Sequence, residues 1–137
     1  MRTVVLDNET VQSLASVTHP KHHTVLAHLE GVVSRRRRGN AVEAVTPTAV
    51  RVEAGWDRTQ PNAATLNRLR IADQILDAQT ANAAATLVAT RVATSVADAH
   101  VGATVQRLAG HEIAVITSDP RDMTAVCSPT SVTIVAI

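Results

Sequence analysis

Four acidic residues each lie beside an apolar segment that would normally be buried. Asp7 and Asp119 each follow a short run of Val, Ile and Leu, while Glu53 and Asp98 fall on the apolar sides of two predicted helices. Buried carboxylates are costly unless a cation pairs with them or a metal coordinates them. The chain has one Lys, so pairing would fall to Arg or to a metal ion. A divalent-metal site is the economical interpretation, and it indicates phosphoryl chemistry.

The elements that must position these acids alternate between short strands and helices. Runs rich in β-branched residues predict strands at Thr3–Leu6, Val42–Val45, Ile71–Leu76, Glu112–Thr117 and Val132–Val135. Apolar residues at helical spacing predict helices at about Glu9–Ala15, Pro20–Gly39, Thr46–Trp56, Asn62–Arg70, Ala81–Arg91, Ser95–Leu108 and Arg121–Val126. Thr46 is expected to cap the third helix, with Pro47 in its first turn. This alternation predicts one α/β domain over residues 1–137, with a mainly parallel sheet.

A parallel sheet would bring the acids toward one edge. Ligands bind outside the carboxyl ends of parallel strands, near the point where the strand order reverses, and Asp7 and Asp119 both come just after predicted strands. Asp98 and Glu53 each share a helix face with apolar residues three or four positions away. All four side chains can therefore converge on one pocket.

Clustered carboxylates suit a hard divalent cation. Mg²⁺ and Mn²⁺ prefer oxygen ligands, and Mg²⁺ keeps several waters around one or two carboxylates. A bound metal can polarise a phosphodiester, supply a deprotonated water and shield the leaving oxygen. Without metal the carboxylates would repel one another, and at least one pKa should rise. The alternative is that each acid caps a helix or pairs with an Arg.

At these residues the chain resembles the PIN-domain ribonucleases, specifically the VapC-like toxins of bacterial toxin–antitoxin pairs. The matching segments, in chain order, are Val4–Asp7, Val45–Glu53, Val96–Val101 and Val115–Asp122. The resemblance implies a three-layer α/β/α PIN-like domain whose acids bind Mg²⁺ or Mn²⁺ and hydrolyse RNA. By motif position, the catalytic acids are Asp7, Glu53, Asp98 and Asp119, and the metal contacts are Asp7, Asp98, Asp119 and Asp122.

The resemblance also implies partners, and it contains one departure. Toxins of this family are usually dimeric and are neutralised by a cognate antitoxin that inserts a segment near the acidic groove. Many members carry a small hydroxyl or amide residue two positions after the first Asp, where this chain has Glu9. Glu9 either adds a carboxylate to the site or marks a branch of the family, and Asn8 or Thr10 can supply the missing polar contact. Thr117 agrees with the hydroxyls usually found before the fourth acid.

The composition excludes some functions and leaves others open. One Trp, with no Phe or Tyr, removes the stacking platforms on which many single-strand binders hold bases. Arg35–Arg38 can grip an RNA backbone or form the solvated end of a helix. Arg51, Arg58 and Arg121 are candidates for touching substrate, although ion pairs with acids would explain them as well.

Other residues and segments are expected to play structural parts or none in chemistry. The histidines near Pro20 are expected to lie on a solvated helix face, and Cys127 is expected to pack in the interior. His100 should point to a different face from Asp98, so it is not assigned as a general base. No apolar run reaches the roughly 18 residues of a membrane span, and the chain starts directly with a strand, so a cytoplasmic location is expected.

Two other classes of function remain open. Asp7-Asn-Glu9-Thr10 after a strand faintly resembles the aspartate-nucleophile phosphatases, and receiver domains also place an aspartate at a strand end. Both designs need a Lys near the phosphoryl group, and Lys21 is in the wrong context. The principal alternative is a PIN-like module that binds RNA or protein without catalysis, and metal binding by the acids distinguishes the two.

Overall fold

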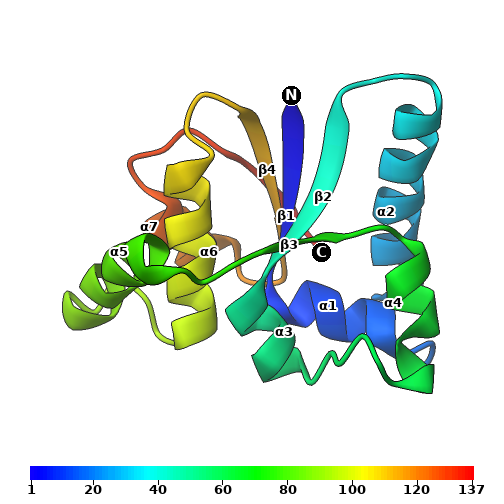
Figure 1. The fold of residues 1–137 in the computed structure, drawn as a ribbon, viewed down its shortest axis with the longest axis horizontal. Coiled ribbons are helices and arrows are strands. Elements are labelled where there is room, and N and C mark those ends of the chain that lie inside the picture. Colours follow the sequence, from blue (N-terminus) through cyan, green and yellow to red (C-terminus); the bar gives the residue numbers. More distant parts are fainter.

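Five short parallel strands form the centre of the fold (Figure 1), which a computed structural model describes for all residues 1–137. The strands are β1 (Arg2–Leu6), β2 (Val42–Pro47), β3 (Ala72–Gln74), β4 (Glu112–Thr117) and β5 (Thr133–Ala136). Their order in the sheet is β3-β2-β1-β4-β5, and every neighbouring pair is parallel. The predicted α/β class with a parallel central sheet is therefore confirmed.

Helices cover both faces of this sheet. They are α1 (Asn8–Ala15), α2 (His22–Arg37), α3 (Thr48–Ala54), α4 (Ala64–Arg68), α5 (Ala78–Ala89), α6 (Val96–Arg107) and α7 (Pro120–Cys127). Helices α1, α2 and α4 lie on one side of the sheet and α5, α6 and α7 on the other, while α3 follows the carboxyl end of β2 (Figure 1). This is the three-layer α/β/α arrangement expected from the sequence. None of the helices combines the length and the apolar character needed to cross a bilayer.

The core is built from aliphatic side chains, as the scarcity of aromatics requires. β1 and β4 are buried on both faces, which explains why their sequences are nearly continuous apolar runs. Helix α6 is buried around most of its circumference, because it packs between the sheet, α5 and α7. Its Gly102 allows the closest approach: a Cβ there would lie 2.6 Å from the Val126 carbonyl oxygen of α7.

The strand order reverses between β1 and β4. The chain moves outward from β1 to β2 and β3, then returns to place β4 on the other side of β1. Leu6, the last residue of β1, lies opposite Ile116 of β4, so Asp7 and Thr117 leave the sheet side by side. This is the point at which parallel sheets commonly bind ligands.

Several predicted boundaries differ from the structure, chiefly those next to two prolines. Pro47 belongs to the end of β2, with an extended ψ of 136°, and α3 begins only at Thr48. Thr46 therefore does not cap α3, since it is held in the ladder opposite Asp73 of β3. Helix α2 begins at His22, two residues after Pro20.

Candidate active site

Asp7 is a buried carboxylate fixed by three hydrogen bonds. It caps the amino end of α1, where its Oδ1 accepts from the Thr10 backbone N–H (2.9 Å) and from Thr10 Oγ1 (2.7 Å). Its Oδ2 accepts from Thr117 Oγ1 of β4. The residue is 5% exposed and has no cation within ion-pair distance. Neutral donors at the amino end of α1 thus orient the carboxylate, and no Lys, Arg or His pairs with it.

Thr117 joins Asp7 to the second strand-end acid. While its hydroxyl donates to Asp7, the same oxygen accepts from the backbone N–H of Asp119 (2.9 Å). Asp119 then caps α7, where its Oδ1 accepts from the Asp122 N–H (3.2 Å). The pKa of Asp122 is raised, first by its hydrogen bond with Asp119 and then by the charge of that residue. The carboxyls of Asp119 and Asp122 therefore lie together, and Thr117 links the backbone of Asp119 to Asp7.

Asp98 comes from α6, which packs against α7 on the same side of the sheet (Figure 1). It lies in the first turn of α6, where its N–H donates to the capping hydroxyl of Ser95 (3.1 Å) and its Oδ2 accepts from Thr94 Oγ1 (3.0 Å). Partial burial raises the pKa of Asp98, and the charges of Asp7, Asp122 and Asp119 raise it further. Thr94 opposes this rise. Such mutual repulsion is what clustered acids without a compensating cation should produce.

Glu53 does not occupy the inward position predicted for it. Helix α3 buries Val50 completely, but Glu53 is exposed one turn later, just before the helix ends at Gly55 in the left-handed region (φ 69°). The helix has only seven residues, so its apolar face leaves the core before reaching Glu53. Glu53 instead lines an open hollow of about 540 Å³ together with Ala97, the neighbour of Asp98. None of Asp7, Asp98, Asp119 and Asp122 lines this hollow.

Arginine pairing does not account for the acids. Arg51 and Arg58 both bind Asp73, at 2.9 Å each, and both lie over the ring of Trp56. None of Asp7, Asp98, Asp119 and Asp122 takes part in an ion pair. Helix capping accounts for one carboxylate oxygen of Asp7 and one of Asp119. The alternative interpretation, in which each acid caps a helix or pairs with an Arg, therefore holds for the capping by these two acids and not for the pairing. We call Asp7, Asp98, Asp119 and Asp122 the acidic cluster.

The hydroxyls around the cluster were partly visible in the sequence. Thr10 supplies the contact to Asp7 that Glu9 cannot, because Glu9 binds the His19 ring at 3.0 Å. Thr94 was missed, although Ser95 and Asp98 form the Ser-x-x-acid pattern of a helix start, which directs attention to the neighbouring hydroxyl.

The histidines have structural roles. His22, expected on a solvated face, is buried and donates from Nδ1 to the Ser13 carbonyl at 2.8 Å, because it anchors the start of α2 against α1. His100 is fully buried and accepts the Ala49 N–H at Nδ1 (3.2 Å). Burial lowers the pKa of His100 to about 4. Neither is placed to act as a general base at the acids.

The acidic cluster does not form a fully protein-ligated metal site. No three His, Cys, Asp or Glu side chains are grouped closely enough to hold a metal together in their present positions. Mg²⁺ commonly binds through one or two carboxylates and keeps the rest of its waters. The unpaired charges and the raised pKa of Asp98 are the features that such an ion would relieve.

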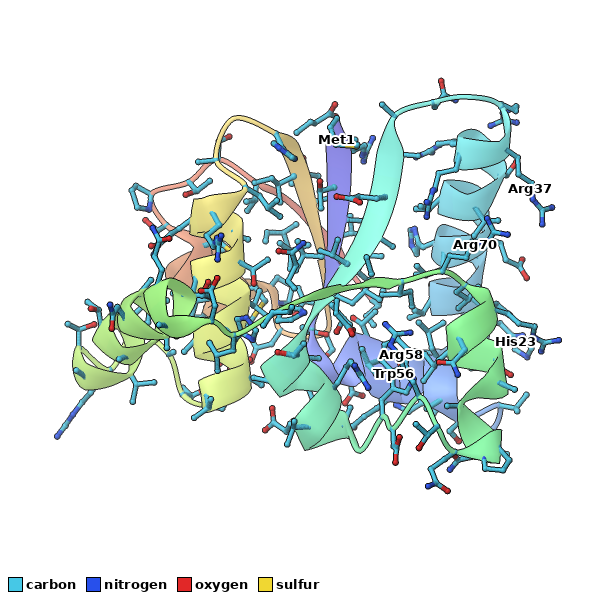
Figure 2. The ribbon with its side chains drawn as sticks, viewed as in Figure 1. Met1, His23, Arg37, Trp56, Arg58 and Arg70 are labelled. Carbon is cyan, nitrogen blue, oxygen red and sulfur yellow. The ribbon has the colours of Figure 1, made fainter.

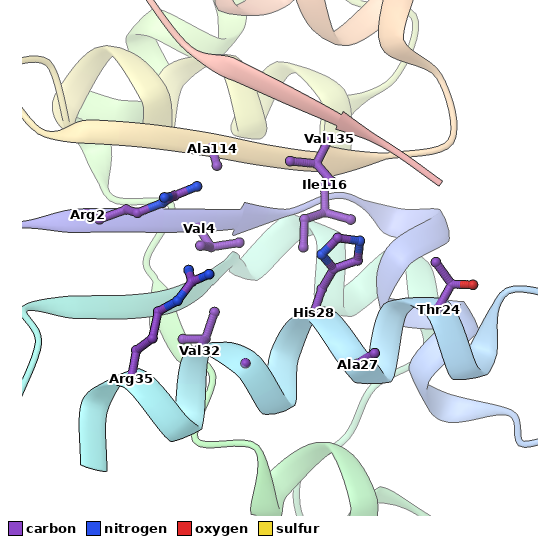
Figure 3. Close-up of a pocket in the computed structure, with 11 residues that line it drawn as sticks. Arg2, Val4, Thr24, Ala27, His28, Val32, Arg35, Ala114, Ile116 and Val135 are labelled. Carbon is purple, nitrogen blue, oxygen red and sulfur yellow. The ribbon is translucent and has the colours of Figure 1, made fainter. Parts of the chain in front are cut away.

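A second hollow is unconnected with the acids. It has a volume of about 530 Å³ and lies between α2 and the sheet, with Val4, Ile116 and Val135 on the strand side and Arg2 and Arg35 at one end (Figure 3). None of the predicted site acids lines it.

No protein-family model matches this chain, and no curated protein sequence matches it. The functional assignment therefore depends on the geometry of the acidic cluster.

Proposed function

We propose that this protein is a Mg²⁺- or Mn²⁺-dependent endoribonuclease of the PIN-like type. The observation that carries the proposal is the unpaired acidic cluster at the strand-order reversal, where burial raises the pKa of Asp98 and the charges of Asp7, Asp122 and Asp119 raise it further. Asp7 is buried and Asp98 is half-buried, and neither has a cation partner. Burying unpaired carboxylates is costly, and a divalent ion is a ligand that relieves this cost. The resemblance of the same segments to VapC-like toxins supports RNA as the substrate.

We assign each acidic residue a part in metal binding from its position. Asp7 is the most firmly oriented ligand, since neutral donors hold both its oxygens. Asp98 and Asp119 complete the principal metal contacts, and Asp122 is an additional one. Glu53 is exposed and lies outside the acidic cluster, so we expect it to matter less than the cluster itself. The bound ion would polarise the phosphodiester and lower the pKa of an attacking water.

The protonation of Asp98 makes metal binding sensitive to pH. A carboxylate must lose its proton before it can coordinate a metal, and the pKa of Asp98 is raised by burial and by its acidic neighbours. Metal affinity should therefore fall as the pH drops through the raised pKa of Asp98. Ordinary exposed carboxylates would lose affinity only at lower pH.

The proposal extends to the biological setting implied by the resemblance. We propose that the protein acts in the cytoplasm as a toxin, that a cognate antitoxin covers the acidic cluster, and that two copies form a homodimer.

Metal-dependent stability and cleavage test the assignment together. Mg²⁺ or Mn²⁺ at a hundredfold excess over the dissociation constant should stabilise the fold by about 2.7 kcal/mol, measured by thermal denaturation. Asp98→Asn should abolish this increase and lower RNA cleavage by about a hundredfold or more. The same variant should be more stable than wild type without metal, because one of four repelling charges is removed. Glu53→Gln should reduce cleavage less.

The matched control is Glu112→Gln, which removes an exposed carboxylate from the amino end of β4. It should leave both the metal response and the cleavage rate unchanged. Undiminished cleavage by purified Asp98→Asn would refute the assignment. If wild type neither binds metal nor cleaves RNA, the chain is a PIN-like binding module instead.

A further inference from the structure

Four arginines line a cleft between α2 and the segment around α4. Arg36 and Arg37 come from the last turn of α2, while Arg68 ends α4 and Arg70 follows it. With Val33 they enclose a volume of about 260 Å³. Figure 2 shows Arg37 and Arg70 at this side of the molecule. We call this feature the arginine cleft.

These arginines have no anionic partner. Arg2, Arg51, Arg58 and Arg107 each bind a carboxylate, but none of the four cleft residues does. The only hydrogen bond within the cleft runs from Arg36 Nη1 to the Arg70 carbonyl oxygen at 3.5 Å. Glu30 lines an adjoining hollow with Arg37 and Arg68 without forming an ion pair. Four gathered positive charges repel one another, and an anion would relieve that repulsion.

The solvated end of a helix explains only part of the cleft. Basic residues in the last turn of α2 complement its dipole, which accounts for Arg36 and Arg37. Arg68 and Arg70 come from a different element about 30 positions later. Arg70 is one of only two non-glycine residues with a positive φ, at 54°. The fold thus brings two separate arginine pairs to one place.

The residues that line the arginine cleft favour a phosphate ligand over a protein partner. Val33 is the only apolar residue in the arginine cleft, so a protein partner would find no apolar centre to bury. The hollow beside α2 in Figure 3 differs, because six of its eleven lining residues are apolar. Guanidinium groups present a planar fork that suits phosphate oxygens. We propose that the arginine cleft binds phosphodiester groups of a polynucleotide.

The location of the cleft defines how the nucleic acid would lie. Arg36 and Arg37 are followed by the amino end of β2, at the opposite end of that strand from the acidic cluster. Arg70 lies two residues before β3, which pairs with the carboxyl half of β2. A strand of five residues spans about 16 Å. The inference rests on the proposed function in one respect: the nucleic acid held here is the RNA cleaved at the acids. Such an RNA must be longer than a dinucleotide.

Binding without metal tests this separately from cleavage. A fluorescent 20-nucleotide RNA is titrated with the protein in EDTA, and anisotropy is measured over a range of salt concentrations, with DNA of the same sequence in parallel. Arg36→Gln/Arg68→Gln should weaken RNA binding at least tenfold and reduce the salt slope by about 1.4, from about 0.7 per lost phosphate contact. Because the contacts are to the backbone, DNA should show the same loss.

The control Arg38→Gln/Arg91→Gln removes the same charge from exposed residues outside the cleft. It should change the affinity less than threefold, and circular dichroism checks that both proteins fold. Equal weakening by the two double variants, or no binding by wild type, would overturn the proposal. So would competition by poly-glutamate as effective, per charge, as that by RNA, since this would indicate an acidic protein partner. Loss of cleavage alone would affect only the proposed nuclease function.

Discussion

At the scale of single residues, Thr117 is the point at which the two halves of the acidic cluster meet. Its hydroxyl donates to Asp7 and accepts from the N–H of Asp119, so both of its hydrogen-bonding capacities are used inside a fully buried position. An alcohol is the one side chain of this size that can do both. This explains why a hydroxyl, rather than an isosteric apolar group, ends β4.

Thr117→Val should therefore destabilise the protein and loosen the site. The variant keeps the shape but leaves the Asp119 N–H unsatisfied and removes one donor from buried Asp7, at an expected cost of about 1–3 kcal/mol. Urea denaturation measures this cost. Thr124→Val, which removes only an exposed hydroxyl bonded to the Pro120 carbonyl, should cost less than about 0.5 kcal/mol. Equal costs would contradict the role given to Thr117.

Burial of His100 should lower the stability of the protein in mild acid. Burial lowers its pKa from 6.5 to about 4, although the charge of Asp77 raises it slightly. Between these values the unfolded chain binds the proton and the folded chain does not. The free energy of unfolding should therefore decrease by up to about 3 kcal/mol as the pH falls through this window. Asp98 and Asp122 act in the opposite direction, since their pKa values are raised.

Substitution separates the histidine from the acids. In His100→Asn the amide oxygen can still accept the Ala49 N–H, but nothing titrates, so the decrease in stability toward acid pH should be smaller than in wild type. The control His23→Asn removes an exposed histidine and should keep the wild-type dependence. Urea denaturation between pH 4 and pH 7 gives the comparison. An unchanged dependence in His100→Asn would show that burial of this ring does not govern the acid response.

How far the site could be predicted depends on what sets each side chain's direction. Asp7 and Asp119 follow buried strands, and the carboxyl end of a parallel strand fixes their position almost regardless of context. Asp98 was predicted from helical spacing, and its neighbour Val101 is indeed fully buried. The inward direction predicted for the Glu53 side chain was wrong, because the same spacing argument was applied to a helix of seven residues, whose end depends on Gly55 and not on periodicity.

At the scale of elements, α6 is the part of the scaffold least tolerant of change. It carries Asp98 at its amino end and is enclosed by α5, α7 and the sheet, so its depth sets where that carboxyl lies. At Gly102 a methyl group would meet the Val126 carbonyl oxygen at 2.6 Å and Leu87 Cδ1 at 2.7 Å. The first of these atoms is backbone and cannot simply rotate away.

Gly102→Ala should accordingly destabilise the fold by about 1–3 kcal/mol, because α6 and α7 must separate. Gly31→Ala is the matched control, since Gly31 also lies within a helix but a Cβ there meets nothing within 4 Å. That substitution should stabilise the protein by about 0.5–1 kcal/mol through helix propensity. Thermal denaturation measures the melting temperature of each variant. A shift of both melting temperatures in the same direction would contradict this account.

The elements themselves were largely predictable. Five strands and seven helices were expected in the order observed, because buried parallel strands have a distinct apolar signature. The boundaries near Pro47 were not, since the fixed φ of proline suits a helix start as well as an extended residue, and only pairing with β3 decides between them. The strand β3 is shorter than the predicted Ile71–Leu76, because it forms the edge of the sheet.

At the scale of the whole molecule, the expected homodimer has a candidate surface. Val52 of α3 and Val96 of α6 are 82% and 60% exposed, and both line the hollow that also contains Glu53. Five of its seven lining residues are apolar. Light scattering at micromolar concentration should therefore detect a dimer. Val96→Asp should shift it toward monomer, whereas Val17→Asp, at a 72% exposed site elsewhere, should not. A wild type that remains monomeric would contradict the homodimer.

The pairing of Leu6 with Ile116 bears on how long the acidic cluster keeps its geometry as the protein partly opens. Central ladders of a sheet are usually the last to open, whereas helix ends and edges fluctuate readily. Because Asp7 and Thr117 extend directly from this ladder, the distance between them should persist through every partial opening and disappear only with global unfolding. Amide exchange at these two positions should then be as slow as the slowest in the molecule. Competence to hold an ion would rise and fall with the integrity of the fold as a whole.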